Sequence, residues 1–258
     1  EPLTMKKIIW VFAGIFALLI AYNIGMDHIR AERKKAAIAE AQAATAVQPQ
    51  TDFRFLDYDL NYQQTTIQGW TVIVNRNLNR SDPQLLRRAL LLLATKLAEI
   101  EAAVPRYPLS RLKSIPFWVE GGTPGLKGMQ YHWSAKWLQD HGYNPAKARA
   151  VEISNIRDFI EWEPTQPWFV MHELAHGFHD RVLGEENADL ISAFNRVSSS
   201  GLYASVKRNN GATERAYALT NRMEYFAEIT EAYFGVNDFF PFNRKELQAY
   251  DRIGFDLM

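Results

Sequence analysis

The segment His172-Glu173-Leu174-Ala175-His176 combines the residue types and the spacing of a metal-binding pentad. Successive residues of an α-helix advance by about 100°, so two side chains four positions apart lie only about 40° from one another. His172 and His176 could therefore direct two imidazole nitrogens at one ion, with Glu173 beside that ion and not on it. The pattern predicts a Zn²⁺ site in which Glu173, as general base, takes a proton from a zinc-activated water that attacks a carbonyl.

The residues before the pentad predict the helix that must present it. Thr165 is the expected N-cap, Pro167 stands in the first turn, and an apolar run leads directly into His172. The alternative is an amphipathic helix whose two histidines serve only packing or solvation.

A catalytic zinc of this kind takes three protein ligands, so a third donor must lie elsewhere in the chain. The segment from Tyr217 to Glu228 is a candidate, because its last part has apolar residues at helical spacing and Asn221 with Glu224 matches a capping box. Glu224 and Glu228 share one face of that helix. Burying two carboxylates there is costly unless a cation or hydrogen-bond donors meet them, and zinc with histidine N–H groups would supply both.

This region resembles the metallopeptidase domain of the anthrax lethal factor family, within the gluzincin group. In that family HExxH is followed further along by a helix of the form Tyr-x-x-Thr-Asn-x-x-Glu-x-Phe-Ala-Glu, and this chain has matching residues at Tyr217, Thr220, Asn221, Glu224, Phe226, Ala227 and Glu228. The resemblance, over about residues 166–235, implies that Glu224 is the third ligand, Tyr217 a transition-state donor and Glu228 an outer-shell carboxylate. No toxin-like cell-binding or translocation portion is recognised, so only the site and its chemistry carry over.

Other readings exist for these residues and their neighbours. Tyr217 could be a half-buried core residue, and Glu228 an exposed helix charge instead of a carboxylate that orients a metal-bound histidine. Glu231 is expected to be solvated, and His179 to be structural because it lies outside the two-ligand spacing. Asp180 could be an outer-shell partner or a plain surface charge.

Two segments upstream of the pentad could border a substrate cleft. Residues 150–155 alternate like a half-buried strand, which could be an exposed edge that pairs with an extended peptide or an ordinary internal strand. Tyr131, His132 and Trp133 form an aromatic stretch that could line the cleft, although core or surface packing is the expected role.

Length and composition indicate one globular domain with an amino-terminal appendage. The chain has 258 residues, 47% of them hydrophobic and 13% aromatic, which is ample for a core of about 200 residues. Strands are expected at 53–58, 70–74 and 116–120, with a long helix over 85–103 that begins near Asp82-Pro83. Strands mostly before the metal helix and helices after it predict an α+β, zincin-like metallopeptidase domain over residues 51–258.

The amino terminus predicts a membrane anchor. Ile8 to Met26 carries no charged residue and follows Lys6 and Lys7; as a helix it would span about 28 Å, close to the roughly 30 Å of bilayer hydrocarbon. Residues 1–30 are therefore expected to form a membrane-anchor segment that crosses the bilayer once, and residues 31–50 an Ala-rich linker. The catalytic domain is expected outside the cytoplasm, and secretion after cleavage of a signal peptide is the alternative.

Charge and cysteine content exclude several classes of function. The chain has 29 basic and 29 acidic residues and a formal net charge of zero, so no bulk field favours nucleic acid. Cysteine is absent, which rules out disulfides, thiol catalysis and thiolate zinc ligation. The sequence thus predicts a membrane-anchored zinc metallopeptidase with peptide or protein substrates and leaves its oligomeric state open. The alternatives are a peptidase-like protein that binds zinc or a partner without turnover, and a zinc hydrolase of non-peptide amides or esters.

Overall fold

The computed structural model describes residue 50 and residues 52–258, which belong to one compact unit, Val47–Met258. The predicted anchor at residues 1–30 and nearly all of the predicted linker lie outside the described residues. Within the described part, no helix has both the length and the hydrophobicity that crossing a bilayer requires.

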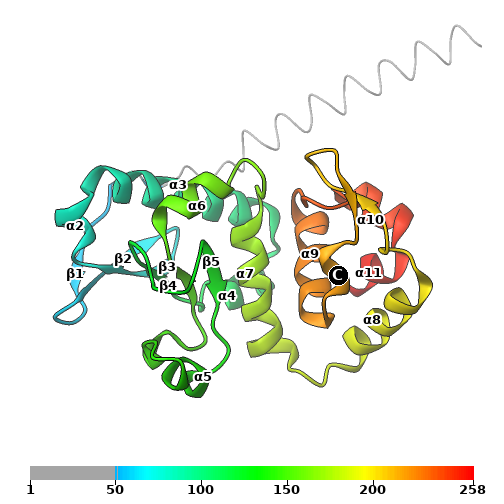
Figure 1. Ribbon diagram of the computed structural model, residues 1–258, viewed down its shortest axis with the longest axis horizontal. Coiled ribbons are helices and arrows are strands. Elements are labelled where there is room, and N and C mark those ends of the chain that lie inside the picture. The colour runs from blue at the N-terminus through cyan, green and yellow to red at the C-terminus, as the bar shows by residue number, and fades with distance from the viewer. Residues whose placement is uncertain (1–49, 51) are drawn as a thin grey trace, which may run out of the picture. The chain divides into compact units, whose positions relative to one another are not determined.

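A six-stranded mixed sheet occupies the first half of the domain, with strand order β1-β2-β3-β4-β6-β5 (Figure 1). The strands are β1 (Leu56–Asp57), β2 (Tyr62–Ile67), β3 (Trp70–Asn75), β4 (Phe117–Val119), β5 (Met129–Tyr131) and β6 (Val151–Ile153). β3, β4 and β6 run parallel to one another, whereas the remaining neighbours pair antiparallel. The predicted strands at 70–74 and 116–120 are confirmed, but residues 53–58 contribute only the two residues of β1.

Both faces of this sheet are covered, because alternate residues of a strand point to opposite sides. Val72, Phe117 and Val151 belong to the main apolar cluster on the helix side of the sheet. Their neighbours Ile73 and Trp118 form a small separate cluster on the opposite side. The second face also carries the fully buried carboxylate of Glu152.

The helices of the first half are α2 (Leu78–Ser81), α3 (Pro83–Ala103), α4 (Arg106–Leu112), α5 (Ala135–Asp140), the 3₁₀ turn η1 (Pro145–Lys147) and α6 (Ile156–Trp162). The predicted long helix is confirmed as α3. Its N-cap is Asp82, whose carboxylate accepts a hydrogen bond of 3.1 Å from the Leu85 N–H, as expected for a short acidic side chain at that position.

The second half is mostly helical. It contains α8 (Ala188–Ser200), the small hairpin β7–β8 (Val206–Lys207 and Thr213–Glu214), the 3₁₀ turn η3 (Tyr217–Leu219), α9 (Arg222–Phe234), α10 (Arg244–Tyr250) and α11 (Arg252–Leu257). These elements enclose a second apolar cluster. Strands mostly first and helices afterwards is the α+β order that the sequence predicts.

The pentad lies on α7 (Phe169–Phe178), which continues into a π-helical turn, η2 (His179–Leu183). Helix α7 borders both apolar clusters, because Val170 and Leu174 belong to the first and Ala175 to the second. Figure 1 shows it standing between the sheet and α9. The pentad therefore lies on a helix that packs against both apolar clusters.

The start of α7 differs from the prediction. Its N-cap is Trp168, with no side-chain cap, so the prediction of Thr165 as N-cap is wrong. Thr165 lies in the turn after α6, and its hydroxyl donates to the Trp162 carbonyl at 2.9 Å. The hydroxyl therefore satisfies the end of the preceding helix instead of starting the next.

Gly177 lets α7 lie close against the sheet. A Cβ atom at this position would approach the Ile115 Cδ1 atom to 2.5 Å and the Tyr131 Cε2 atom to 3.0 Å. Such contacts would push α7 away from the end of β5. The absence of a side chain at Gly177 thus lets α7 lie close to β5.

Candidate metal centre

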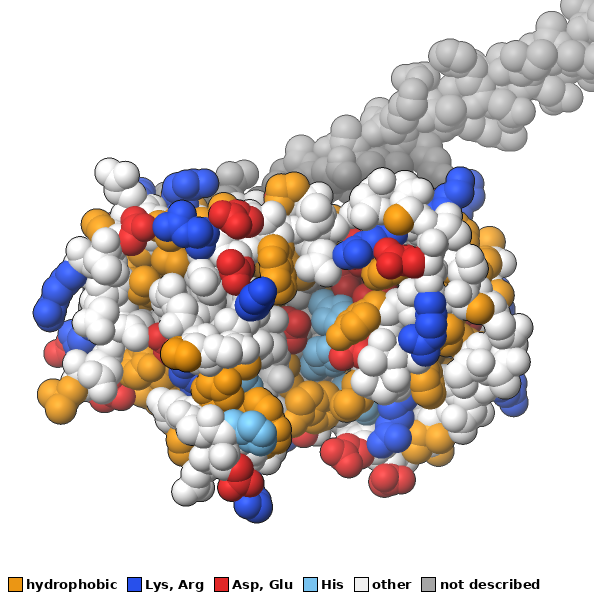
Figure 2. Space-filling model, viewed as in Figure 1, with side chains coloured by type: hydrophobic (Ala, Val, Ile, Leu, Met, Phe, Trp, Pro, Cys, Tyr) orange, Lys and Arg blue, Asp and Glu red, His pale blue; other side chains and the backbone are white. Residues whose placement is uncertain are grey.

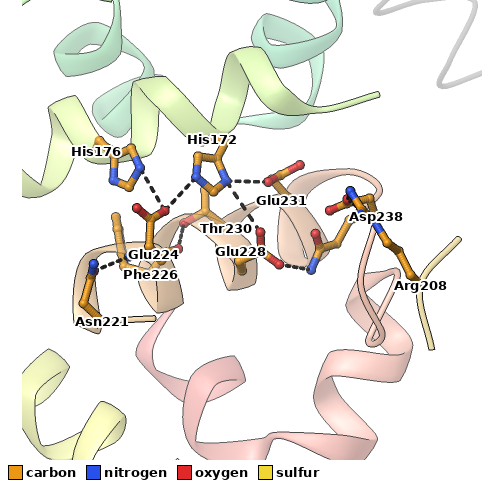
Figure 3. A network of polar contacts seen from close by, with 11 residues as sticks. His172, His176, Arg208, Asn221, Glu224, Phe226, Glu228, Thr230, Glu231 and Asp238 are labelled. Atoms are coloured by element: carbon orange, nitrogen blue, oxygen red, sulfur yellow. Dashed lines mark hydrogen bonds and ion pairs between the residues drawn. The ribbon is translucent and has the colours of Figure 1, made fainter. Parts of the chain in front are cut away.

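Three donor atoms converge between α7 and α9. Glu224 Oε2 lies 3.0 Å from His172 Nε2 and 3.2 Å from His176 Nε2, and one ligand atom from each residue lies within 4.8 Å of the other two. Figure 3 shows both imidazoles pointing from α7 toward the Glu224 carboxylate on α9. The three residues singled out as ligands from the sequence are therefore brought together.

The N-terminus of α9 positions Glu224 next to the two histidines. The Asn221 side chain accepts hydrogen bonds from the Met223 and Glu224 N–H groups, at 2.8 and 3.0 Å. The expected capping box is only half formed, because the Glu224 carboxylate meets the histidines and does not return to the Asn221 N–H. Asn221 alone fixes the first turn, and this frees Glu224 for the site.

Glu231 is buried at the donor set, contrary to the prediction from the sequence. It is only 3% exposed, and its Oε1 atom lies 2.7 Å from His172 Nδ1, so the prediction that it is solvated is wrong. Positions 224, 228 and 231 are separated by four and three residues, which places all three on one helical face. That spacing was the signal in the sequence that could have found Glu231.

Glu228 is buried next to the same histidine but lies further from it. Its Oε1 atom is 3.8 Å from His172 Nδ1, and its Oε2 atom accepts a hydrogen bond of 3.1 Å from Asn237 Nδ2. The alternative of an exposed helix charge is wrong, since the residue is 4% exposed. A metal-binding imidazole needs an acceptor for its second nitrogen, and the closer carboxylate here is Glu231.

Burial and close charges set the protonation of the cluster. Burial raises the pKa of Glu224, but its hydrogen bonds with His172 and His176 outweigh burial and lower the pKa strongly. Burial likewise disfavours charged His172, yet its hydrogen bonds with Glu224 and Glu231 raise the pKa well above its usual value. A bound cation would compete with protons for these donor atoms.

Glu173 lies beside the donor set and is held by the sheet. Its Oε2 atom accepts a hydrogen bond of 2.7 Å from the backbone N–H of Tyr131 in β5. Burial raises the pKa of Glu173, and the charges of His176 and His172 oppose that rise. The pentad predicts this position beside the ligands, but no sequence pattern identifies the backbone group that holds the carboxylate.

Tyr217 faces the same space from η3. Its side chain is 46% exposed, and its ring centre lies 6.2 Å from that of His172. Burial and then the charge of Glu224 raise the pKa of its phenol, so the O–H remains available as a donor at neutral pH. The residue therefore lies at the cleft surface and not in the core.

A cleft of about 650 Å³ contains these groups. β5 lines one side and the stretch from the β7–β8 hairpin to α9 lines the other, with Trp133 and Trp162 also contributing. Figure 2 shows the hollow at the middle of the molecule with histidine side chains at its floor. Both pentad histidines and Glu173 are thus reachable by a molecule larger than water.

The strand that borders this cleft is β5, whereas residues 151–153 form the internal strand β6 between β4 and β5. Of the two readings of residues 150–155, the internal strand is therefore correct. Tyr131 and Trp133 line the cleft, while His132 is buried against Glu152, with 2.6 Å between Nε2 and Oε2.

The remaining candidates lie outside the donor set. His179 is fully buried, packs edge-on against Trp133 with ring centres 5.6 Å apart, and has no polar partner in the described part of the chain. Asp180 accepts hydrogen bonds from the Tyr131 hydroxyl at 2.6 Å and from Arg149 Nε at 3.0 Å. It is neither a partner of the donor set nor a plain surface charge, because it ties η2 to β5.

The donor set is chemically suited to a divalent metal ion. It offers two imidazole nitrogens and one carboxylate oxygen, its His172 ligand is oriented by a buried carboxylate, and its open side faces the cleft. Three protein ligands with one accessible side is the arrangement of a catalytic metal site, since structural sites are closed by four. No protein-family model, curated protein or solved structure matches this chain.

Proposed function

We propose that this protein is a zinc-dependent metallopeptidase of the zincin type, with His172, His176 and Glu224 as the ligands. The observation that carries the proposal is the convergence of these three donors beside Glu173 in an open cleft. Two imidazole nitrogens and one carboxylate oxygen form a ligand set that suits Zn²⁺. The resemblance of residues 166–235 to the lethal factor family supports the same reading.

A bound Zn²⁺ would supply Lewis acidity, polarising a substrate carbonyl and lowering the pKa of water toward about 7. Glu173 is placed to accept the proton of the attacking water, because the Tyr131 N–H fixes its carboxylate next to the donor set. The Tyr217 hydroxyl faces the cleft and is available to donate a hydrogen bond to the oxyanion that forms on the carbonyl.

The outer edge of β5, whose Tyr131 N–H is held by Glu173 but which pairs with no second described strand, favours a peptide as substrate over other amides or esters. β6 is the only hydrogen-bonded neighbour of β5 among the described strands, and β5 residues line the cleft. An extended peptide could add to this edge through main-chain hydrogen bonds. We also propose, from the sequence alone, that residues 1–30 anchor the domain to a membrane with the domain outside the cytoplasm.

The test compares wild type with Glu173→Gln, an isosteric variant that can still accept the Tyr131 N–H. Both should retain zinc, and the variant should lose about 10²- to 10⁴-fold in turnover of a peptide library. Zinc content is measured by elemental analysis and cleavage by mass spectrometry. Equal turnover by the two proteins would remove Glu173 from the mechanism, and zinc retention without cleavage by wild type would favour a binding protein over an enzyme.

A further inference from the structure

A second cavity adjoins the metal cleft along β5. It measures about 380 Å³ and is lined by Leu126, Gln130, Tyr131, His132, Trp133, Ser134 and Trp137. We call it the Trp137 pocket. Gln130, Tyr131 and Trp133 also line the cleft, so the two cavities adjoin along the same strand. A molecule bound along β5 would border both.

The side chains of β5 alternate between the two sides. Met129 and Tyr131 belong to the main apolar cluster on the α7 side. Gln130 instead donates to Ser154 Oγ, and His132 binds Glu152, both on the opposite face. A peptide added to this edge follows the same period of two, so every second side chain points to the same face of the sheet. Gln130 and Tyr131, which lie on opposite faces, both line the Trp137 pocket.

The Trp137 pocket has a preformed aromatic wall. The Trp137 indole is 46% exposed and is stacked on His141, with ring centres 4.1 Å apart and planes at 22°. Ser134 caps α5 by accepting a hydrogen bond from the backbone N–H of Trp137 at 3.2 Å, which fixes the start of that helix. A fixed indole loses little conformational freedom when a ligand covers it, which is the property of aromatic residues that dominate binding.

The two cavities differ in charge. The metal cleft is bordered by acidic residues and by Arg208 and Arg215, whereas no Asp, Glu, Lys or Arg lines the Trp137 pocket. Its one imidazole, on His132, is already bonded to Glu152. A charged side chain would find no counter-charge in this pocket, so an apolar one fits it best.

We propose that the Trp137 pocket binds an aromatic or large aliphatic side chain of the peptide substrate, on the amino-terminal side of the scissile bond. This inference rests on the proposed peptidase function. The direction follows from antiparallel pairing, which is more stable per residue than parallel pairing. An antiparallel peptide has its amino-terminal part beyond the carboxyl end of β5, where Trp133 and Trp137 follow in the chain.

The experiment pairs variants of the protein with variants of a cleaved peptide. Peptides carry Phe or Ala at each position before the cleavage site, and kcat/KM is measured for zinc-loaded wild type, Trp137→Ala and Trp137→Phe. Tyr107→Ala is the control, because Tyr107 is 67% exposed and lies on α4, away from both cavities. Wild type and control should prefer Phe over Ala at one such position by about tenfold. Trp137→Ala should lose this preference and Trp137→Phe should keep part of it, whereas Tyr107→Ala should cleave both peptides as wild type does.

The outcomes separate this inference from the proposed function. If wild type cleaves peptides without a preference before the scissile bond, or prefers Phe only after it, the pocket assignment is overturned and the peptidase function stands. An undiminished preference in Trp137→Ala also overturns the assignment. If zinc-loaded wild type cleaves no peptide of the series or of the library, both proposals fall. The Phe-to-Ala series in wild type decides the matter even if Trp137→Ala does not fold.

Discussion

At the residue scale, the orientation of His172 depends on Glu231, a carboxylate that the sequence analysis expected to be solvated. Glu231 is the closer acceptor for His172 Nδ1, at 2.7 Å against 3.8 Å for Glu228. Partners of this kind fix the ring and its tautomer, and their loss weakens metal binding about 10- to 100-fold. The difference between the two distances assigns that role to Glu231.

We therefore predict that Glu231→Leu weakens zinc binding about 10- to 100-fold, because His172 loses its acceptor. Glu231→Gln should lose less, since its amide oxygen can still accept the Nδ1–H. Glu228→Gln is the matched control on the same helical face and should bind zinc nearly as wild type does. Zinc affinity is measured by competition with a chromogenic chelator. Equal affinities for Glu231→Leu and wild type would contradict the role given to Glu231.

The residue-level predictions held where helical geometry alone decides them. A four-residue spacing on a helix brings His172 and His176 together wherever that helix packs. The position of Glu224 relative to the histidines depends on how α9 packs against α7. The role of Glu224 as third ligand was predicted from the resemblance to the lethal factor family. The Tyr131 N–H that holds Glu173 is a backbone group, and no side-chain pattern marks it. Glu231 was recoverable, because three positions beyond Glu228 is the same face.

At the element scale, the cap of α9 links helix stability to the metal site. Asn221→Ala removes the acceptor for the Met223 and Glu224 N–H groups and should cost about 1 kcal/mol in the free energy of unfolding. Asn243 caps α10 in the same way, through the Lys245 and Glu246 N–H groups. Both Asn→Ala changes should lower stability in urea, but only Asn221→Ala should also weaken zinc binding. A loss of zinc affinity of the same size in both variants would point to general destabilisation.

A buried ion-pair network holds in place the segment that connects β5 to β6 and contains α5 and η1. Glu152 in β6 meets Lys147 Nζ at 2.7 Å, His132 Nε2 at 2.6 Å and Thr123 Oγ1 at 2.6 Å. Burial raises the pKa of Glu152, but the hydrogen bond with His132 and the charge and hydrogen bond of Lys147 outweigh it and lower the pKa from 4.5 to about 2. The network therefore requires an ionised carboxylate.

This shift predicts a pH dependence of stability with a definite sign. The folded-state pKa of Glu152 is below the unfolded value, so its contribution is complete above pH 4.5 and is lost as the pH falls toward about 2. The contribution is at most about 3 kcal/mol. Urea unfolding of wild type between pH 7 and pH 2.5 should show the loss, and Glu152→Gln should show a smaller slope over that range. Identical slopes would contradict the assignment.

Helices and strands were predicted correctly where the residues of the element itself determine it. They were predicted poorly where pairing with a neighbouring element determines it. Asp82 and Pro83 mark the start of α3 by capping, and the long Leu-rich stretch sustains it. β5 has only three residues, too few to show an alternation, and its place at the sheet edge is set by pairing with β6. The alternation at residues 150–155 therefore allowed an edge strand at this position, although residues 151–153 form the internal strand β6.

At the scale of the whole molecule, the donor set joins α7, which borders both apolar clusters, to α9, which belongs to the second. His172 and His176 come from α7, which packs against the sheet cluster, whereas Glu224 comes from α9 in the second cluster. Composition predicts enough hydrophobic residues for a core but not their division into two clusters with a helix between them. Because of this division, metal binding and the docking of the two halves are expected to be coupled.

Zinc should therefore stabilise the entire domain. An ion that binds only the folded state at about 1,000 times its Kd adds about 4 kcal/mol, which for a domain of this size raises Tm by about 10 °C. Differential scanning calorimetry with zinc or with a chelator should show this rise in wild type as one cooperative transition. Glu173→Gln keeps all three ligands and should show the same rise, whereas Glu224→Gln, which replaces the ligand on α9, should show little. A rise confined to part of a split transition, or an equal rise in Glu224→Gln, would mean that the ion does not bridge the two halves.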